Sequence, residues 1–421
     1  MRRPIPAVCI LAAALAADLP AQVSYTVERA VQDALTRNLD IAAARYGVGI
    51  AEAKRITAGL RPNPVLSANA DHLDWLGTGF DNTTNNAGPS EYGVRADFLV
   101  ERGKKREARM ELAAADKTLA QLTFEDVQRK LVFDVVNAFI DVQLAKETLS
   151  LAKENLQSLL RVAEVNQARV ATGDLAVVEL NRSKVATAQY QTAVRQAELQ
   201  LAQAKNRLRL LVGEDSGNID VTGAIRRDVG PSDLTTIREI AIKQRPDLQG
   251  AKQLQARNQA DLRLQLSQTK IDLTAGAEYR RQQSPSARSN SIGLYISAPL
   301  PIFNKNQGEI ARSEQEIAQA KALARSMEAH ILNEAAAAWE QYTSAGQLLK
   351  EMESDLLNRA KDVRSTTEYS YRRGEASLIE FLDAQRAFND TVQSYNSARA
   401  DYARALYLID TVMAARVAGQ P

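Results

Sequence analysis

The stretch ATGDLAVVELNRSK (171–184) is echoed by RRGEASLIEFLDAQ (372–385), and this pair decides how the rest of the chain is interpreted. Each stretch has one glycine, Gly173 or Gly374, followed by an acid, an apolar pair and a second acid. Glycine accepts the left-handed backbone that ends a helix and reverses the chain, so each stretch predicts the tip of a helical hairpin. Taken alone, each is also compatible with an ordinary turn between two helices.

The remaining sequence also comes in two copies. The segment ALTRNLDIAAA (34–44) returns as AIKQRPDLQGA (241–251), and LSANADH (66–72) returns as LTAGAEY (273–279). This repetition predicts an internal duplication. We expect a first structural repeat at 23–230 and a second at 231–421.

Proline placement predicts where the long helices lie. No proline occurs between Pro89 and Pro231 or between Pro301 and Pro421. Because proline interrupts helix interiors, helices fit into these gaps and between the other prolines. Helical periodicity predicts three helices in each repeat. In the first repeat they span 26–60, 104–172 and a helix that runs back from the Gly173 turn to about 212. In the second repeat they span 233–268, 308–373 and a helix that runs back from the Gly374 turn to about 415. The segment 214–231 is predicted to be a linker.

Between these helices, the segments 65–101 and 271–301 alternate apolar and polar residues with a period of two. This pattern predicts two β-hairpins, each with one apolar and one charged face. In an exported protein such strands fit a transmembrane barrel, and since four strands cannot close a barrel, several copies must contribute. A small soluble sandwich packed on the helices is the alternative. The residues expected to face lipid are Tyr92, Val94, Phe98, Leu273, Ile292, Leu294 and Ile296, and those expected to face a wet lumen are Arg95, Asp97, Glu101, Asp272 and Glu278.

The first 22 residues read as a secretory signal peptide. Arg2 and Arg3 precede an apolar run at 5–17, and small residues follow it. The run is too short for a permanent membrane span. The single cysteine, Cys9, lies inside the run, so we expect an exported protein without disulfides and without a lipid anchor.

Composition argues against several classes of function. A net charge of +2 gives no electrostatic case for nucleic-acid binding. The two histidines, His72 and His330, fall in different halves without ligand spacing, so neither a dedicated metal site nor a cofactor is expected. The sequence also lacks a phosphate loop and a nucleophile elbow, so we do not expect an enzyme.

With these features together, the chain resembles the outer membrane factor family, the TolC-like exit ducts of bacterial efflux and secretion systems. The resemblance rests on the duplicated order of helix, β-hairpin, long helix, glycine turn and return helix. It also rests on RPNP (61–64) and on LPIFNKNQGEIARSEQEIAQAKA (300–322). The last two stretches are most similar to the heavy-metal branch, which serves cobalt–zinc–cadmium and copper–silver exporters.

The resemblance implies a homotrimer in which four strands per protomer form a twelve-stranded barrel in the outer membrane. The helices would form a hollow α-barrel through the periplasm. Its far end would meet a membrane-fusion adaptor linked to an inner-membrane pump of the RND type. The implied function is export of divalent heavy-metal cations. Drugs, small organic solutes or secreted proteins are alternative cargoes, and a periplasmic coiled-coil scaffold without a pore is the alternative class.

The same resemblance assigns roles to residues near the two glycines. The implied periplasmic aperture residues are Glu179, Tyr371, Glu380 and Asp383. The implied adaptor-docking tips comprise Gly173, Asp174, Leu175, Gly374, Glu375, Ala376 and Ser377. Threefold symmetry would turn Glu380 and Asp383 into carboxylate rings that raise one another's pKa values. Ala376 stands where a family member has a closing arginine, so Arg182, Arg372 or Arg373 is expected to serve instead.

Overall fold

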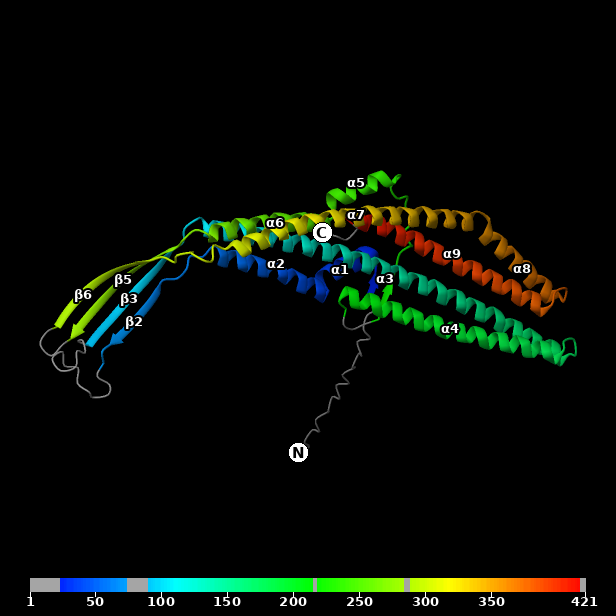
Figure 1. Ribbon diagram of the computed structural model, residues 1–421. Helices are drawn as coiled ribbons and strands as arrows, with labels where there is room; N and C mark the ends of the chain where they lie inside the picture. Colours follow the sequence, from blue (N-terminus) through cyan, green and yellow to red (C-terminus); the bar gives the residue numbers. More distant parts are fainter. Residues whose placement is uncertain (1–22, 74–89, 215–217, 284–287, 417–421) are drawn as a thin grey trace, which may run out of the picture.

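The computed structural model describes residues 23–73, 90–214, 218–283 and 288–416. The predicted signal peptide and Cys9 lie outside these residues. Long helices and a small sheet make up an elongated molecule, with the sheet at one end and two helical hairpin tips at the other (Figure 1). No described helix is long and apolar enough to cross a membrane.

The elements follow the duplicated order that the sequence predicts. The first half contains β1 (Val23–Tyr25), α1 (Val27–Arg37), α2 (Leu39–Ala58), β2 (Val65–Asp71), β3 (Ser90–Val100), α3 (Lys105–Ala171), α4 (Val177–Val212) and β4 (Ile219–Val221). The second half contains α5 (Leu234–Gln244), α6 (Pro246–Gln268), β5 (Leu273–Gln283), β6 (Arg288–Ser297), α7 (Gln307–Glu351), the π-helical segment η1 (Met352–Leu356), α8 (Leu357–Arg373) and α9 (Leu378–Val412). The predicted fold class, mainly helical with four strands in one sheet and an internal duplication, is confirmed, and the short strands β1 and β4 form a second, unpredicted pair.

Two predicted helices are each divided in two. The prediction of one helix at 26–60 is wrong because the chain leaves the helix at Asn38, whose φ of −62° and ψ of 130° are extended. The Asn38 side chain accepts from the backbone N–H of Asp40 at 2.9 Å and so caps α2. The helix predicted at 233–268 breaks at Arg245, because the ring of Pro246 disfavours helical backbone in the residue before it.

Two further expectations are corrected by the structure. The segment 214–231 is more than a linker, because its strand β4 pairs in parallel with β1. The helix predicted at 308–373 is interrupted by η1, and the chain bends there between α7 and α8 (Figure 1). An extra residue in a helical turn of this kind is a recognised cause of a helix bend.

The four strands form one antiparallel sheet in the order β2-β3-β5-β6. Its register places Val94 opposite Ala68 and Tyr279, and Leu294 opposite Ala277. Side chains alternate between the faces of a strand, so most apolar residues of the four strands share one face, whereas Val65, Leu99 and Tyr295 lie on the other. The outer edges of β2 and β6 have no partner strand among the described residues.

The two faces of the sheet differ as predicted from the alternation. Leu294 is 84% exposed, and six of the seven predicted lipid-facing residues are exposed, whereas Leu273 is half-buried. On the opposite face, Arg95 pairs with Asp97 at 2.8 Å and Arg280 pairs with Glu91 at 3.1 Å. The sheet extends beyond the helices (Figure 1), so the alternative of a sandwich packed on them is not what forms.

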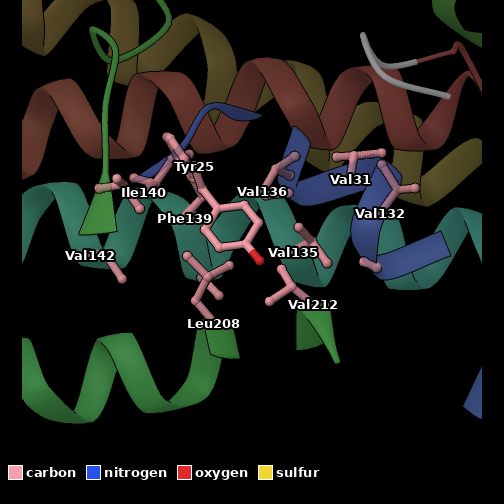
Figure 2. Close-up of a cluster of buried hydrophobic side chains, with 14 of the residues drawn as sticks. Tyr25, Val31, Val132, Val135, Val136, Phe139, Ile140, Val142, Leu208 and Val212 are labelled. Carbon is pink, nitrogen blue, oxygen red and sulfur yellow. The ribbon is translucent and has the colours of Figure 1, made fainter. Parts of the chain in front are cut away.

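The largest apolar core lies at mid-height of the helices, where α1, β1 and β4 pack on α3 and α4. Tyr25 and Phe139 are fully buried there beside Leu208 (Figure 2). A second core joins α5 to α7 and α9. The two cores anchor the short elements α1, β1, β4 and α5 to the long helices.

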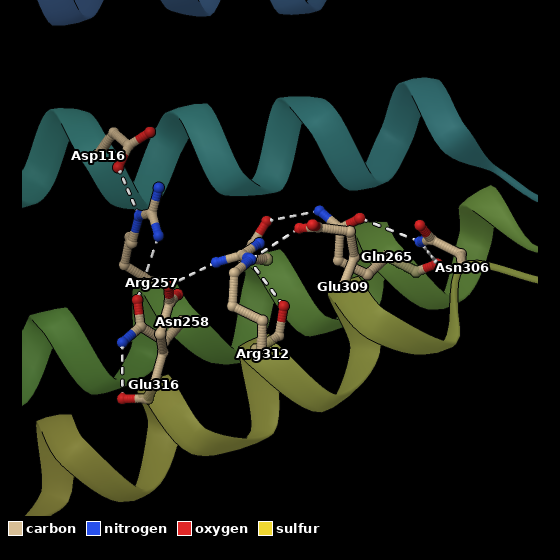
Figure 3. A network of polar contacts seen from close by, with 10 residues as sticks. Asp116, Arg257, Asn258, Gln265, Asn306, Glu309, Arg312 and Glu316 are labelled. Carbon is tan, nitrogen blue, oxygen red and sulfur yellow. Dashed lines mark hydrogen bonds and ion pairs between the residues drawn. The ribbon is translucent and has the colours of Figure 1, made fainter.

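Nearer the sheet, charged side chains join α3, α6 and α7 (Figure 3). Arg257 on α6 reaches Asp116 on α3 at 3.0 Å. Arg312 on α7 reaches Asp261 on α6 at 2.9 Å, and Ser313 donates to the same carboxylate at 3.1 Å. Burial alone would raise the pKa of Asp261, but the hydrogen bonds from Gln265, Arg312 and Ser313 outweigh it and lower that pKa.

The substitution Asp261→Asn is therefore expected to destabilise the fold at neutral pH. Loss of charge-assisted bonds to a buried carboxylate costs about 1.5–3 kcal/mol. Because the folded-state pKa is lowered, the contribution of Asp261 is present above its unfolded pKa, about 4, and is lost as the pH falls through the folded value. Melting temperatures measured from pH 7 to pH 3 should show the wild type and the variant converging at low pH. Asp134→Asn, at an exposed site on α3 that forms no ion pair with another described residue, is the control, and an equal effect of both variants would contradict the prediction.

Candidate functional site

The two glycine turns form the end of the molecule farthest from the sheet (Figure 1). Gly173 has a φ of +83° and Gly374 a φ of +81°. In both turns a backbone N–H bonds back to a carbonyl five residues earlier, from Asp174 to Arg169 at 2.8 Å and from Glu375 to Ser370 at 2.9 Å. A Cβ at Gly173 would meet nothing within 4 Å, so the backbone conformation, not a lack of space, requires glycine there.

The second tip is capped more firmly than the first. The Ser377 hydroxyl accepts from the Glu380 N–H at 3.3 Å, and the Glu380 carboxylate accepts from the Ser377 N–H at 2.7 Å. Within one protomer these bonds lower the pKa of Glu380, and the rise expected from a ring of carboxylates between protomers stays a prediction. In the first tip, Ala176 occupies the corresponding position and provides no side-chain cap.

The four predicted aperture residues have different surroundings. Glu179 is half-buried and pairs with Arg182 at 2.8 Å. Asp383 is exposed and lies 3.6 Å from Arg386, while Glu380 belongs to the cap just described. Tyr371, by contrast, is only 5% exposed.

Tyr371 joins the two hairpins. Its hydroxyl donates to Asn166 Oδ1 on α3 at 2.6 Å. Its ring stacks on Phe381 with centroids 5.5 Å apart, inside an apolar cluster that includes Leu159 and Val162. Burial raises the pKa of Tyr371, so the phenol stays neutral at physiological pH and remains a hydrogen-bond donor.

A second buried polar chain crosses between the hairpins. Gln385 on α9 donates to Asn155 on α3 at 2.9 Å, and both side chains are buried. Gln385 also donates to Asn389 at 3.1 Å, and Asn389 donates to the Tyr190 hydroxyl on α4 at 2.8 Å. The sequence analysis missed these residues, although amides on the buried side of a coiled-coil stripe were a signal that could have found them.

The arginines expected to close the aperture pair within their own hairpins. Arg182 pairs with Glu179, Arg372 with Glu368 at 2.5 Å, and Arg373 lies 4.0 Å from Glu375. Within one protomer the hairpins are joined by the neutral amides and phenols described above and by ion pairs of other arginines, such as Arg364 with Glu154 at 3.7 Å and Arg399 with Glu147 at 3.1 Å. A closing role for these arginines between protomers stays a prediction.

The bend at η1 is tied to the chain segment that follows β4. Glu353 in η1 pairs with Arg227 of that segment and accepts from the Tyr395 hydroxyl of α9 at 3.0 Å. The hairpin of α8 and α9 is thus connected through Glu353 to the segment that follows β4. Such π segments are often found at functional positions.

In the part of the chain that the structure describes, no three His, Cys, Asp or Glu side chains are grouped so that they could hold a metal ion. A duct for metal cations needs no resident site, because ions pass through a hydrated lumen.

Comparisons with known proteins match this geometry. The family model described as "Outer membrane efflux protein" matches residues 30–214 and 237–414, one segment in each half. The cobalt-zinc-cadmium resistance protein CzcC of Cupriavidus metallidurans is 24% identical over 397 residues, covering 92% of this chain and 90% of that protein. The cation efflux system protein CusC of Escherichia coli is 24% identical, covering 88% of this chain and 82% of that protein.

A crystal structure of CusC superposes with a TM-score of 0.75 at 19% identity, covering 93% of this chain and 92% of that one. This likeness confirms the fold. Because the family model matches most of the chain, in both halves, the chain belongs to the outer membrane efflux protein family.

Proposed function

We propose that this chain is the outer-membrane exit duct of a tripartite exporter of divalent heavy-metal cations. The duct would be passive, and an inner-membrane pump would drive transport through a periplasmic adaptor. The observation that carries the proposal is the sheet: one face is apolar and exposed, the other is charged, and both edges lack a partner strand among the described residues. The names of the relatives CzcC and CusC favour metal cations as cargo.

The sheet geometry supports a trimer. An isolated sheet with exposed apolar side chains and two open edges is a liability in water, and closure into a barrel removes the edges. Three copies of four strands give twelve, an even number within the range of outer-membrane barrels. In such a ring, β6 of one protomer would pair with β2 of the next, and the charged faces would line the lumen.

The hairpin tips support docking of an adaptor. Beyond each glycine turn, apolar side chains point into solvent: Val177 and Val178 after the first turn, and Ile379 after the second. Exposed apolar residues flanked by charges are typical of interaction surfaces. A trimer would present six such tips in a ring, two from each protomer.

The polar contacts between hairpins suggest how the duct opens. Neutral hydrogen bonds such as those of Tyr371 and Gln385 are each worth about 1 kcal/mol net, so adaptor binding can exchange them for other contacts. The bend at η1 would act as a hinge about which α8 and α9 rotate relative to α3 and α7. The mid-height core, by contrast, is apolar and densely packed and would stay fixed.

Cross-linking in native cells tests the proposal directly. The described residues contain no cysteine, so a single Glu375→Cys variant can be labelled at the second tip without removing the Ser377 cap. We expect capture of a periplasmic adaptor that belongs to a metal-exporting pump, whereas Arg195→Cys, exposed on α4, should capture less. Capture of a drug-pump adaptor would overturn the proposed cargo. Release of the protein in a soluble osmotic-shock fraction would overturn the duct and favour a scaffold.

A further inference from the structure

A pocket of about 500 Å³ lies where the sheet meets the helices. It is formed by the segment after α2, the end of β3 and the start of α3. Its charged lining includes four cations, Arg61, Lys104, Lys105 and Arg106, and two acids. Apolar atoms of Pro62, Leu99 and Val100 complete the wall.

Only one of the four cations has a carboxylate partner among the described residues. Lys105 pairs with Asp272 at 2.7 Å, and Arg106 donates to the Gly59 carbonyl at 2.6 Å. The side chains of Arg61 and Lys104 make no hydrogen bond or ion pair with the rest of the described chain. Of the acids, Glu101 is neutralised by Arg109, which donates to it at 2.9 Å. Glu107 is the other acid, and its single negative charge is outweighed by the cations without a carboxylate partner. The net charge of the pocket lining is therefore positive.

The pocket lies at the boundary of the apolar face. Val65 begins β2 and Val100 ends β3, opposite Leu273 at the start of β5. Val100 shares the apolar face with Phe98 and is itself half exposed, whereas the lining residues Leu99 and Glu101 lie on the charged side of β3. The pocket therefore begins where the proposed lipid-facing band ends.

Other residues at this end of the sheet extend the apolar surface. Leu300, Ile302 and Phe303 follow β6, and Phe303 is 91% exposed. Lys305 comes directly after them and has no side-chain partner among the described residues. Apolar and aromatic side chains bordered by cations are typical of the level at which a membrane protein meets lipid headgroups.

We propose that the pocket binds the phosphate of a phospholipid in the periplasm-facing leaflet of the outer membrane. The Arg61 guanidinium and the Lys104 ammonium would contact the phosphate, because neither pairs with another described residue and guanidinium groups match phosphate geometry. Pro62 and Val100 would contact the first carbons of an acyl chain. The site would fix the height of the duct in the membrane, three times per trimer. This inference rests on the proposed function.

Lipid binding by the full-length protein tests the inference. Purified protein in detergent is titrated with a short-chain phosphatidylglycerol, and bound lipid per protomer is measured by native mass spectrometry. In Arg61→Gln with Lys104→Gln, affinity should fall about fivefold for each charge removed. The matched control, Arg195→Gln with Lys361→Gln, removes the same charge from exposed sites on α4 and α8 that pair with no other described residue, and it should bind like the wild type.

The single variant Arg61→Gln, in a segment outside helix and strand, keeps the test decisive if the double variant does not fold. Unchanged lipid affinity in a folded variant would overturn the site. Inorganic phosphate that competes as well as the lipid would show a general anion site and also overturn it. If the wild type neither inserts into bilayers nor conducts ions, the proposed duct itself fails. If it conducts normally while the variants bind lipid like the wild type, only the lipid site fails.

Discussion

Replacing Leu294 with arginine is expected to abolish assembly of the protein in the outer membrane. Leu294 is 84% exposed in the middle of the apolar face, opposite Ala277 of β5. An arginine facing lipid near the membrane centre costs about 2–4 kcal/mol in an outer-membrane barrel. Three copies would raise the cost to about 6–12 kcal/mol, comparable to the whole stability of a typical domain.

The measurement is the amount of protein that sediments with outer membranes and needs detergent for extraction. Ser289→Arg is the matched control, because Ser289 lies on the same strand, β6, but on the polar face, opposite Gln282. The control should assemble like the wild type. If both variants assemble normally, Leu294 does not face lipid. If both fail, the defect comes from β6 itself and not from one of its faces.

Removing the hydroxyl of Tyr371 is expected to weaken the closed arrangement of the tips and raise single-channel conductance. In Tyr371→Phe the buried Asn166 loses its partner, and its Nδ2 group already lacks one in the described structure. An unsatisfied buried polar group costs about 1–3 kcal/mol, which shifts a closed–open equilibrium by about five- to 150-fold. Stacking on Phe381 is retained, so local packing should survive.

Planar-bilayer recordings of the assembled protein provide the measurement. Tyr369→Phe is the control: Tyr369 lies two residues away on the same helix but is exposed, and its hydroxyl bonds to no other described residue. The cation–π contact of Arg373 with its ring survives the change. Equal conductance in both variants and the wild type would show that the Tyr371–Asn166 bond does not hold the tips together.

Features with a local physical cause were predictable from the sequence. Alternation with a period of two located the β-hairpins and their apolar face, because successive side chains of a strand point to opposite sides. Gly173 and Gly374 located the tips, because few other residues accept their backbone conformation. The repeated order of these signals established the duplicated fold. The roles of individual tip residues remain predictions.

Features that depend on contacts between distant segments were decided only by the tertiary structure. β1 and β4 have three residues each and pair across almost two hundred positions, so neither has a recognisable local signal. Asn38 ends a helix partly because its side chain also bonds to the Leu211 carbonyl of α4 at 3.0 Å. The same holds for Tyr371: the family resemblance implied a polar residue at an aperture, but packing between the hairpins buries it against Asn166. Periodicity specifies which face of an element is apolar, whereas the partner that covers that face is set by the whole fold.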